Sequence, residues 1–78
     1  MIDHALLKKV MATVLEVDVS EIREDSSMDS IASWDSLRQM NLVLALEESF
    51  AVTIPDEDAA NATSYPLIAL VLEEQRAP

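Results

Sequence analysis

Apolar residues recur at three- and four-residue spacing in three stretches of the chain, which is the spacing of one face of an α-helix. The first stretch runs from Asp3 to about residue 16, and its apolar positions are Leu6, Leu7, Val10, Met11, Val14 and Leu15. The second runs from about Ser36 to Phe50. The third follows Thr63 or Ser64, either of which can cap a helix, and continues to about residue 75. The pattern therefore predicts three main helices.

The segments between these stretches are of two kinds. A short acidic segment begins at Pro55 and favours a fourth, shorter helix, because Pro and acidic residues suit a first helical turn. Val52 and Ile54 alternate as in a strand, but a single strand would have no partner. Residues 16–35 show no helical period, yet they carry apolar positions that indicate a packed loop with a short helical turn, namely Val17, Val19, Ile22, Met28 and Ile31. We expect an all-α fold, a small four-helix bundle with a short third helix and a long ordered loop between the first two helices.

The apolar arc of helix 36–50 covers well over half of its circumference, which is more than packing against one neighbour requires. Its polar arc is made by Arg38, Asn41, Ala45, Glu48 and Ser49. Two interpretations stay open. The helix is central in the bundle, or a row of apolar residues stays exposed for a partner, namely Leu37, Met40 and Leu44.

Composition limits the classes of function. The 78 residues suffice for one domain, which we take to span 1–78. Fifteen acidic residues against five basic ones give a net charge of −10, which argues against nucleic acid or an anionic membrane as a partner and favours basic proteins. No apolar run is long enough to cross a membrane, and Lys8 and Lys9 interrupt the apolar start that a secretion signal needs, so we expect a cytoplasmic protein. We also expect it to be a monomer.

Candidate catalytic chemistry is sparse. The only His is His4, close to the start of the chain, and the absence of Cys leaves no thiol nucleophile. The absence of Gly excludes phosphate-cradling loops and requires tight turns to use Asn, Asp, Ser or Pro. A calcium loop from Asp56 would need a bidentate Glu where Leu67 stands. We therefore predict no catalytic residue, no metal site and no enzyme activity of its own.

Ser36 is the remaining candidate, in the stretch SWDSLRQM at residues 33–40. Ser36 and Gln39 fit a capping box, and Asp35 is an equally good N-cap. On this stretch alone a capping role for Ser36 is favoured. If Asp35 is the cap instead, the Ser36 hydroxyl is free at the first helical position, where a phosphate ester would lie beside unpaired N–H groups.

The run from Asp35, DSLRQMNLVLALEESFAVTIPDEDA, closely resembles the acyl carrier proteins, the phosphopantetheine-binding carriers of fatty-acid and polyketide synthesis. The family's D-S-L motif, its LxxALEExF second helix and the IPDE that precedes its short third helix occur at matching intervals. The loop text VDVSEIREDSSM is also similar to the family's, so the resemblance spans nearly the whole chain. The form W-D-S-L looks like that of discrete carriers of specialised pathways.

The resemblance implies that Ser36 is esterified by 4′-phosphopantetheine, which a phosphopantetheinyl transferase takes from coenzyme A. Asp35 would cap the helix and assist the magnesium-dependent transfer. The thiol of the arm would hold acyl groups as thioesters and so supply the sulfur that a chain without Cys lacks. The carrier would deliver them to an acyltransferase, a ketosynthase or an acyl-activating ligase.

The same resemblance suggests further site residues. Partner docking would use the second helix, through Leu37, Arg38, Met40, Asn41, Leu44, Glu47 and Glu48. An acyl pocket would have Leu46, Ile54, Ala62 and Ile68 as walls, although core packing explains these four equally well. For Trp34 we favour a ring packed in the core over direct partner contact.

Departures from the family pattern bear on the pathway. Many fatty-acid carriers have acidic residues where this chain has Arg38, Asn41 and Ser49, which favours a specialised polyketide or fatty-acid-like pathway over housekeeping fatty-acid synthesis. An aminoacyl or peptidyl carrier of a nonribosomal pathway is the second choice, because the G-G-x-S motif of peptidyl carriers is absent. The alternative from another class is an acidic helical interaction module without a prosthetic group.

Overall fold

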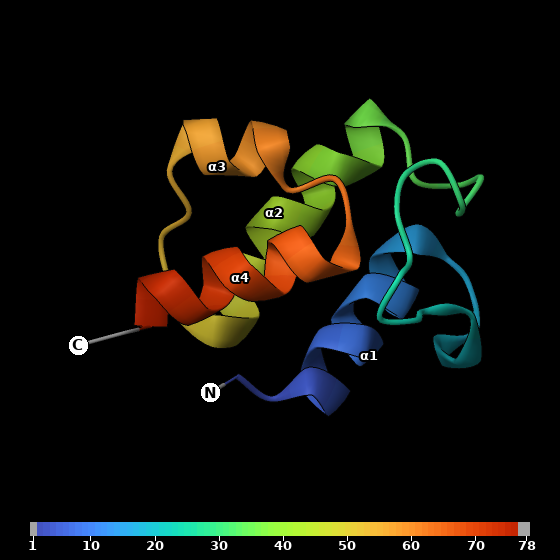
Figure 1. Ribbon diagram of the computed structural model, residues 1–78, viewed down its shortest axis with the longest axis horizontal. Coiled ribbons are helices and arrows are strands. Elements are labelled where there is room, and N and C mark those ends of the chain that lie inside the picture. The colour runs from blue at the N-terminus through green and yellow to red at the C-terminus, as the bar shows by residue number, and fades with distance from the viewer. Residues whose placement is uncertain (1, 77–78) are drawn as a thin grey trace.

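The computed structural model describes residues 2–76. Four α-helices follow one another along the chain (Figure 1): α1 His4–Leu15, α2 Ser36–Phe50, α3 Asp56–Asn61 and α4 Tyr65–Arg76. A single 3₁₀ turn, η1 Val19–Glu21, is the short helical turn expected in the long loop. The part of the chain that the structure describes contains no strand, only an isolated bridge between Ser27 and Ser64. The predicted all-α fold is confirmed.

The helices begin where side chains can accept hydrogen bonds from their first N–H groups. Asp3 caps α1 by accepting from the Leu6 N–H at 3.1 Å. In η1, Asp18 and Glu21 form a reciprocal capping box. The Asp18 side chain accepts from the backbone of the turn, and the Glu21 side chain accepts from the Asp18 N–H. The helix boundaries expected from the apolar period therefore agree with the structure to within one or two residues.

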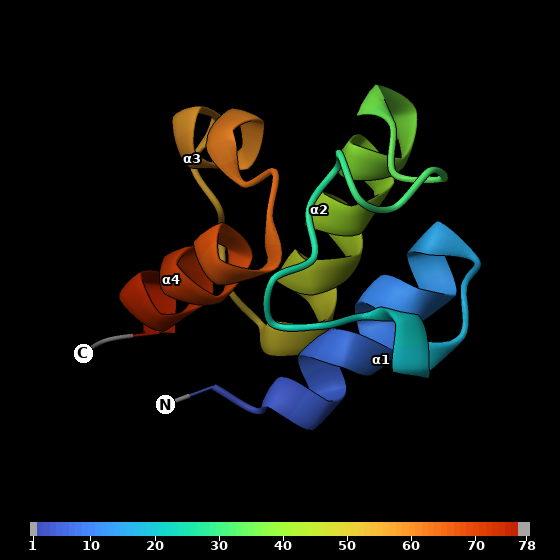
Figure 2. The same ribbon diagram turned by 45° about the vertical axis from the view of Figure 1, so that its right-hand side comes forward.

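The core is mostly aliphatic and forms between α1, α2 and α4. Its largest fully buried side chains come from all three helices, namely Leu7, Met11, Leu15, Leu42, Leu46, Ile68 and Leu72. In both ribbon views α2 lies in the middle, with α1 on one side and α3 and α4 on the other (Figures 1 and 2). The central position explains most of the wide apolar arc of α2, and the row Leu37, Met40 and Leu44 is nevertheless exposed. Both features that the sequence left as alternatives are present.

The loop between α1 and α2 is packed down as predicted, with Ile22, Ile31 and Trp34 buried, although Val19 is exposed. Two backbone hydrogen bonds fasten it to the junction of α3 and α4. The Met28 N–H donates to the Thr63 carbonyl at 3.0 Å, and the Tyr65 N–H donates to the Ser26 carbonyl at 2.8 Å. We call this pair of bonds the loop strap. None of the helices within residues 2–76 is long and apolar enough to cross a membrane.

The lack of Gly has a local consequence that the sequence did not predict. Glu16 and Ala51 end α1 and α2 with φ of 57° and 54°, in the left-handed region that favours Gly or Asn. The expectation that tight turns would use Asn, Asp, Ser or Pro is therefore wrong at these two positions. Each residue still donates its N–H to the helix, Glu16 to the Ala12 carbonyl and Ala51 to the Glu47 carbonyl.

Ala51→Gly should raise the free energy of unfolding by up to about 1 kcal/mol. The substitution removes the left-handed penalty on a Cβ-bearing residue, and this gain exceeds the added freedom of the unfolded chain. The measurement is urea unfolding followed by circular dichroism. Ala45→Gly, in the interior of α2, is the matched control and should lower the same quantity by about 1 kcal/mol. A loss of stability in Ala51→Gly would contradict the argument.

Candidate functional site

Ser36 is the first residue of α2 and lies exposed at the protein surface. The helix is capped by Asp35, whose extended backbone lets its Oδ1 accept from the Arg38 N–H at 2.9 Å. The alternative capping box does not form, because the Gln39 side chain is bonded elsewhere. The structure thus selects Asp35 as the cap, and the Ser36 hydroxyl is not needed for that role.

The start of α2 suits a phosphate ester. The first N–H groups of a helix have no partner within the helix. In α2, the Arg38 N–H donates to the Asp35 side chain. Those of Ser36 and Leu37 remain directed out of the helix end, beside the Ser36 side chain, and they carry the positive end of the helix dipole. A phosphodiester on Ser36 would meet backbone donors there, so the residues present fit the group.

Residues on both sides of Ser36 are tied to the end of α1. Ser33 Oγ donates to the Leu15 carbonyl at 2.7 Å, and Arg38 Nη1 donates to the Val14 carbonyl at 3.0 Å. Arg38 Nη2 also contacts Glu16 Oε2 at 2.6 Å. These side chains satisfy carbonyls in the last turn of α1, which a helix leaves without partners. Arg38 was predicted as a docking contact. It has this structural role as well, and its docking role stays a prediction.

Trp34 and Gln39 form a buried polar network that links three parts of the chain. Trp34 Nε1 donates to Gln39 Oε1 at 2.7 Å, and Gln39 Nε2 donates to the carbonyls of Ala59 at 2.9 Å and Ala62 at 2.8 Å. Trp34 is 2% exposed and Gln39 9%. The interpretation of Trp34 as a core residue is confirmed. We call these three bonds the Gln39 network.

Sequence reasoning did not single out the role of Gln39. The available signal was its position, because it shares a helix face with the buried Leu42 and Leu46 at three- and seven-residue spacing. A polar residue at such a position needs buried partners. Those partners are carbonyls at the end of α3, which the spacing within α2 cannot reveal.

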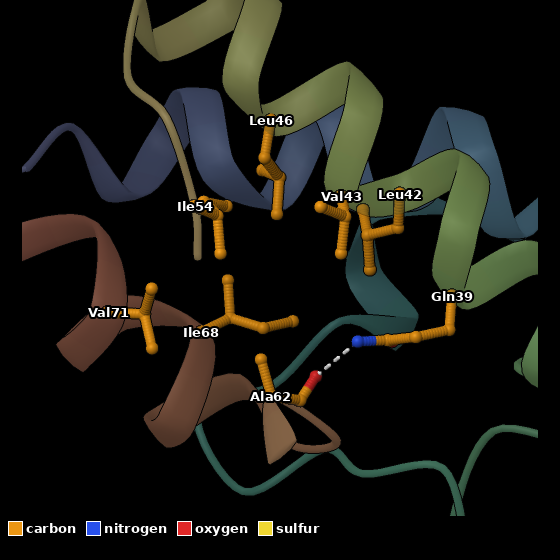
Figure 3. Close-up of a pocket in the computed structure, with 8 residues that line it drawn as sticks. All are labelled: Gln39, Leu42, Val43, Leu46, Ile54, Ala62, Ile68 and Val71. Carbon is orange, nitrogen blue, oxygen red and sulfur yellow. Dashed lines mark hydrogen bonds between the residues drawn. The ribbon is translucent and has the colours of Figure 1, made fainter. Parts of the chain in front are cut away.

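The four suggested pocket walls do meet around one cavity, between α2, the segment before α3, and α4 (Figure 3). The cavity holds only about 10 Å³ and has Gln39 at one end. Leu46, Ile54, Ala62 and Ile68 are all buried core residues. We call this space the interior cavity. At this volume it is a packing defect of the core, and its use as an acyl pocket stays a prediction.

The suggested docking residues lie along the outer side of α2. Leu37, Met40 and Leu44 are 68%, 66% and 63% exposed, a large apolar area for so small a protein. Asn41 and Glu48 are exposed beside them. Glu47 has a structural contact, since its Oε2 accepts from the Ile54 N–H at 2.8 Å. An open groove of about 370 Å³ runs between α2 and α3 next to this row, and we call it the outer groove.

Other polar features lie away from Ser36. His4 Nδ1 is 2.6 Å from the Tyr65 hydroxyl, which joins the start of α1 to the start of α4. Burial, with a smaller contribution from the charge of Glu24, raises the pKa of Tyr65 above its usual 10.0. Within residues 2–76, no cluster of His, Asp and Glu side chains has an arrangement that could hold a metal ion.

Comparison with known proteins gives two findings. A family model described as the phosphopantetheine attachment site matches residues 5–71. The fold is similar to that of holo acyl carrier protein from Geobacter metallireducens, with a TM-score of 0.79, 21% sequence identity, and coverage of 91% of this chain and 82% of that chain. At this level of identity the second finding shows the fold alone.

Arg38→Met should lower the free energy of unfolding by about 1–2 kcal/mol, because the Val14 carbonyl loses a charged donor in a partly buried position. Glu16→Gln removes only the exposed ion pair and should cost less than about 1 kcal/mol. Urea unfolding of both variants measures the change in the free energy of unfolding for each substitution. If Arg38→Met costs no more than Glu16→Gln, the bond to α1 contributes nothing to stability.

Proposed function

The chain belongs to the phosphopantetheine attachment-site family, whose members are carrier proteins, and we propose that Ser36 is the residue to which its covalent 4′-phosphopantetheine is attached. One observation carries the assignment. Ser36 is exposed at the first position of α2 while Asp35 makes the cap, so an accessible hydroxyl lies beside unpaired backbone donors. The imported arm also provides a thiol to a chain that has no Cys.

In the proposed transfer, the Ser36 hydroxyl oxygen attacks the phosphorus of coenzyme A that bears the pantetheine. A bond forms between that oxygen and phosphorus, the diphosphate bridge breaks, and 3′,5′-ADP leaves. The hydroxyl proton passes to a base of the transferase or to water. Asp35 holds the helix start in place, and its exposed carboxylate would assist the magnesium-dependent transfer. The loaded chain performs no further chemistry and presents its thioester to other enzymes.

Docking is proposed to use the exposed row of Leu37, Met40 and Leu44 beside Ser36. Asn41, Glu47 and Glu48 flank this row, and Arg38 adds a positive charge near the attachment point. A net charge of −10 favours partners with basic surfaces and speeds their encounter with the carrier. The partners are the phosphopantetheinyl transferase and the acyltransferase, ketosynthase or acyl-activating ligase of its pathway.

For the pathway we propose polyketide or fatty-acid-type synthesis, in the cytoplasm and with the carrier as a monomer. The mixed charge around Ser36, with Arg38 and Asn41 on the docking helix, supports a specialised partner set. An aminoacyl or peptidyl carrier is the second candidate, disfavoured by the lack of a G-G-x-S motif. An acidic interaction module that is never loaded is the alternative of another class.

The first test is loading. Incubation with coenzyme A, magnesium and a broad-specificity phosphopantetheinyl transferase should add one phosphopantetheine to the intact mass. Ser36→Ala should abolish the addition, and Ser49→Ala, an exposed serine on the same helix, should preserve it. Loading of the Ser36→Ala variant would refute the attachment residue, and no loading of the natural chain would favour the interaction module.

The second test concerns docking. Leu37→Asp should lower kcat/KM for the transferase by about tenfold, because an interface loses a central apolar contact and gains a charge. Leu70→Asp is the matched control, since Leu70 is 52% exposed on α4. The substitution introduces the same charge away from α2. Both variants should keep the thermal stability of the natural chain within the usual scatter of surface substitutions. Equal effects of the two variants on kcat/KM would contradict docking on this row.

A further inference from the structure

Two spaces could receive a chain tethered to Ser36, and Gln39 lines both of them. The interior cavity holds about 10 Å³, roughly the room that one water needs. The outer groove holds about 370 Å³ and lies open between α2 and α3. A third hollow, of about 320 Å³, borders α1 and is lined by Ala45. Ala45 lies on the opposite side of α2 from Ser36, so this hollow does not face the attachment point.

The outer groove is lined in part by residues on the same face of α2 as Ser36. Met40 and Val43 line it, and they follow Ser36 by four and seven residues, so all three share one face of α2. A chain that follows this face from Ser36 would reach the groove at Met40, about one helical turn further along α2. Apolar contacts in the groove come from Met40, Leu44, Ile54 and Ala59, whereas Glu47 and Asp56 add carboxylates.

The Gln39 network lies at the boundary between the two spaces, where Gln39, Val43 and Ile54 line both. Figure 3 shows the Gln39 carboxamide extending from α2 to the Ala62 carbonyl at one end of the cavity. Its nitrogen donates to two carbonyls and its oxygen accepts from the Trp34 indole, so its main polar atoms are satisfied inside the protein. An acyl chain that pushed past Gln39 would leave these buried groups without partners.

The same network also resists widening of the cavity. Both carbonyls that Gln39 binds lie at the end of α3, so these bonds hold that end against α2. Room for an acyl chain requires α2 and the α3–α4 junction to move apart, which stretches or breaks the same bonds. The loop strap also holds that junction, through Thr63 and Tyr65.

We propose that the Gln39 network determines where the cargo lies: it keeps an aliphatic acyl chain in the outer groove, accessible to enzymes, and out of the interior cavity. For this chain, the proposal takes the place of the acyl pocket that the resemblance suggested around the interior cavity. Gln39 acts here as a positioning residue, since it touches neither the thioester nor the attachment atom. The inference rests on the proposed attachment at Ser36. Gln39→Leu should open the interior, because it removes the bonds to α3 and replaces a carboxamide with an apolar side chain of similar size.

The test compares acetyl- and octanoyl-loaded protein by methyl NMR, with loading from the corresponding acyl-coenzyme A. Ile68 and Val71 line only the interior cavity, whereas Met40 and Leu44 line only the outer groove. In the natural chain, the change from acetyl to octanoyl should shift the Met40 and Leu44 methyl signals and leave those of Ile68 and Val71 in place. In Gln39→Leu, the Ile68 and Val71 signals should shift instead.

A second readout is the reaction of the thioester with hydroxylamine, whose nitrogen attacks the carbonyl carbon. The C–S bond breaks, the amine proton passes to the thiolate, and a hydroxamate and the free thiol result. In the natural chain the acetyl and octanoyl forms should react at nearly equal rates. In Gln39→Leu the octanoyl form should react about tenfold more slowly if about nine molecules in ten have the chain buried.

Two further variants keep the test decisive. Ser49→Leu makes a similar polar-to-apolar change on an exposed position of α2 and should behave as the natural chain. Trp34→Phe keeps a ring in the core but removes the indole donor, and it should show the Gln39→Leu pattern in weaker form. This variant takes over the test if Gln39→Leu does not fold. Thermal unfolding separates this effect from general destabilisation, which would not depend on acyl length.

The inference is overturned if octanoyl loading of the natural chain shifts Ile68 and Val71, or if neither Gln39→Leu nor Trp34→Phe changes the dependence on acyl length. Intact mass distinguishes these outcomes from failure of the proposed function. A chain that is loaded on Ser36 but buries its cargo refutes only the role of Gln39. A chain that cannot be loaded on Ser36 refutes both.

Discussion

The hydrogen bond from the Arg38 N–H to the Asp35 carboxylate is the contact on which the site depends. Because Asp35 caps the helix, the neighbouring Ser36 hydroxyl is not needed as the cap and stays at the surface. Arg38 takes part in this cap through its backbone and reaches α1 through its side chain. Ser33 reaches the same helix end from the other side. The residues on both sides of the exposed hydroxyl are thus hydrogen-bonded to the end of α1.

The Gln39 network solves a different problem, which is how to hold a helix of six residues in place. A helix as short as α3 is not stable by itself, and Pro55 at its N-cap has no polar side chain with which to cap it. Its last carbonyls accept from Gln39, and the indole of Trp34 completes the carboxamide's bonding. The residues that position α3 therefore lie within a few positions of Ser36, so the proposed attachment point and the boundary of the outer groove share one support.

Much of the fold could be predicted from the sequence, because the apolar period and the capping residues act locally. Helix ends at Asp3 and Asp35 follow from side chains adjacent to the helices they cap. The identity of the prosthetic group followed from the resemblance of nearly the whole chain to a known family, and the family match bears it out. The left-handed ends at Glu16 and Ala51 could not be predicted, because neither residue type favours that conformation. The partners of Gln39 lie on α3, and such tertiary contacts leave no trace in the spacing of one helix.

The loop strap has a consequence for the order in which the protein folds. Helices α1 and α2 contain their own hydrogen bonds and can form from local contacts, whereas the strap joins Ser26 and Met28 to residues far along the chain. Closing such a long loop lowers the entropy of the chain before the two hydrogen bonds of the strap can form. We therefore expect the strap, and with it the final seating of the α3–α4 junction, to form last. A nascent chain would then acquire its cap at Asp35 before the surface around Ser36 is complete.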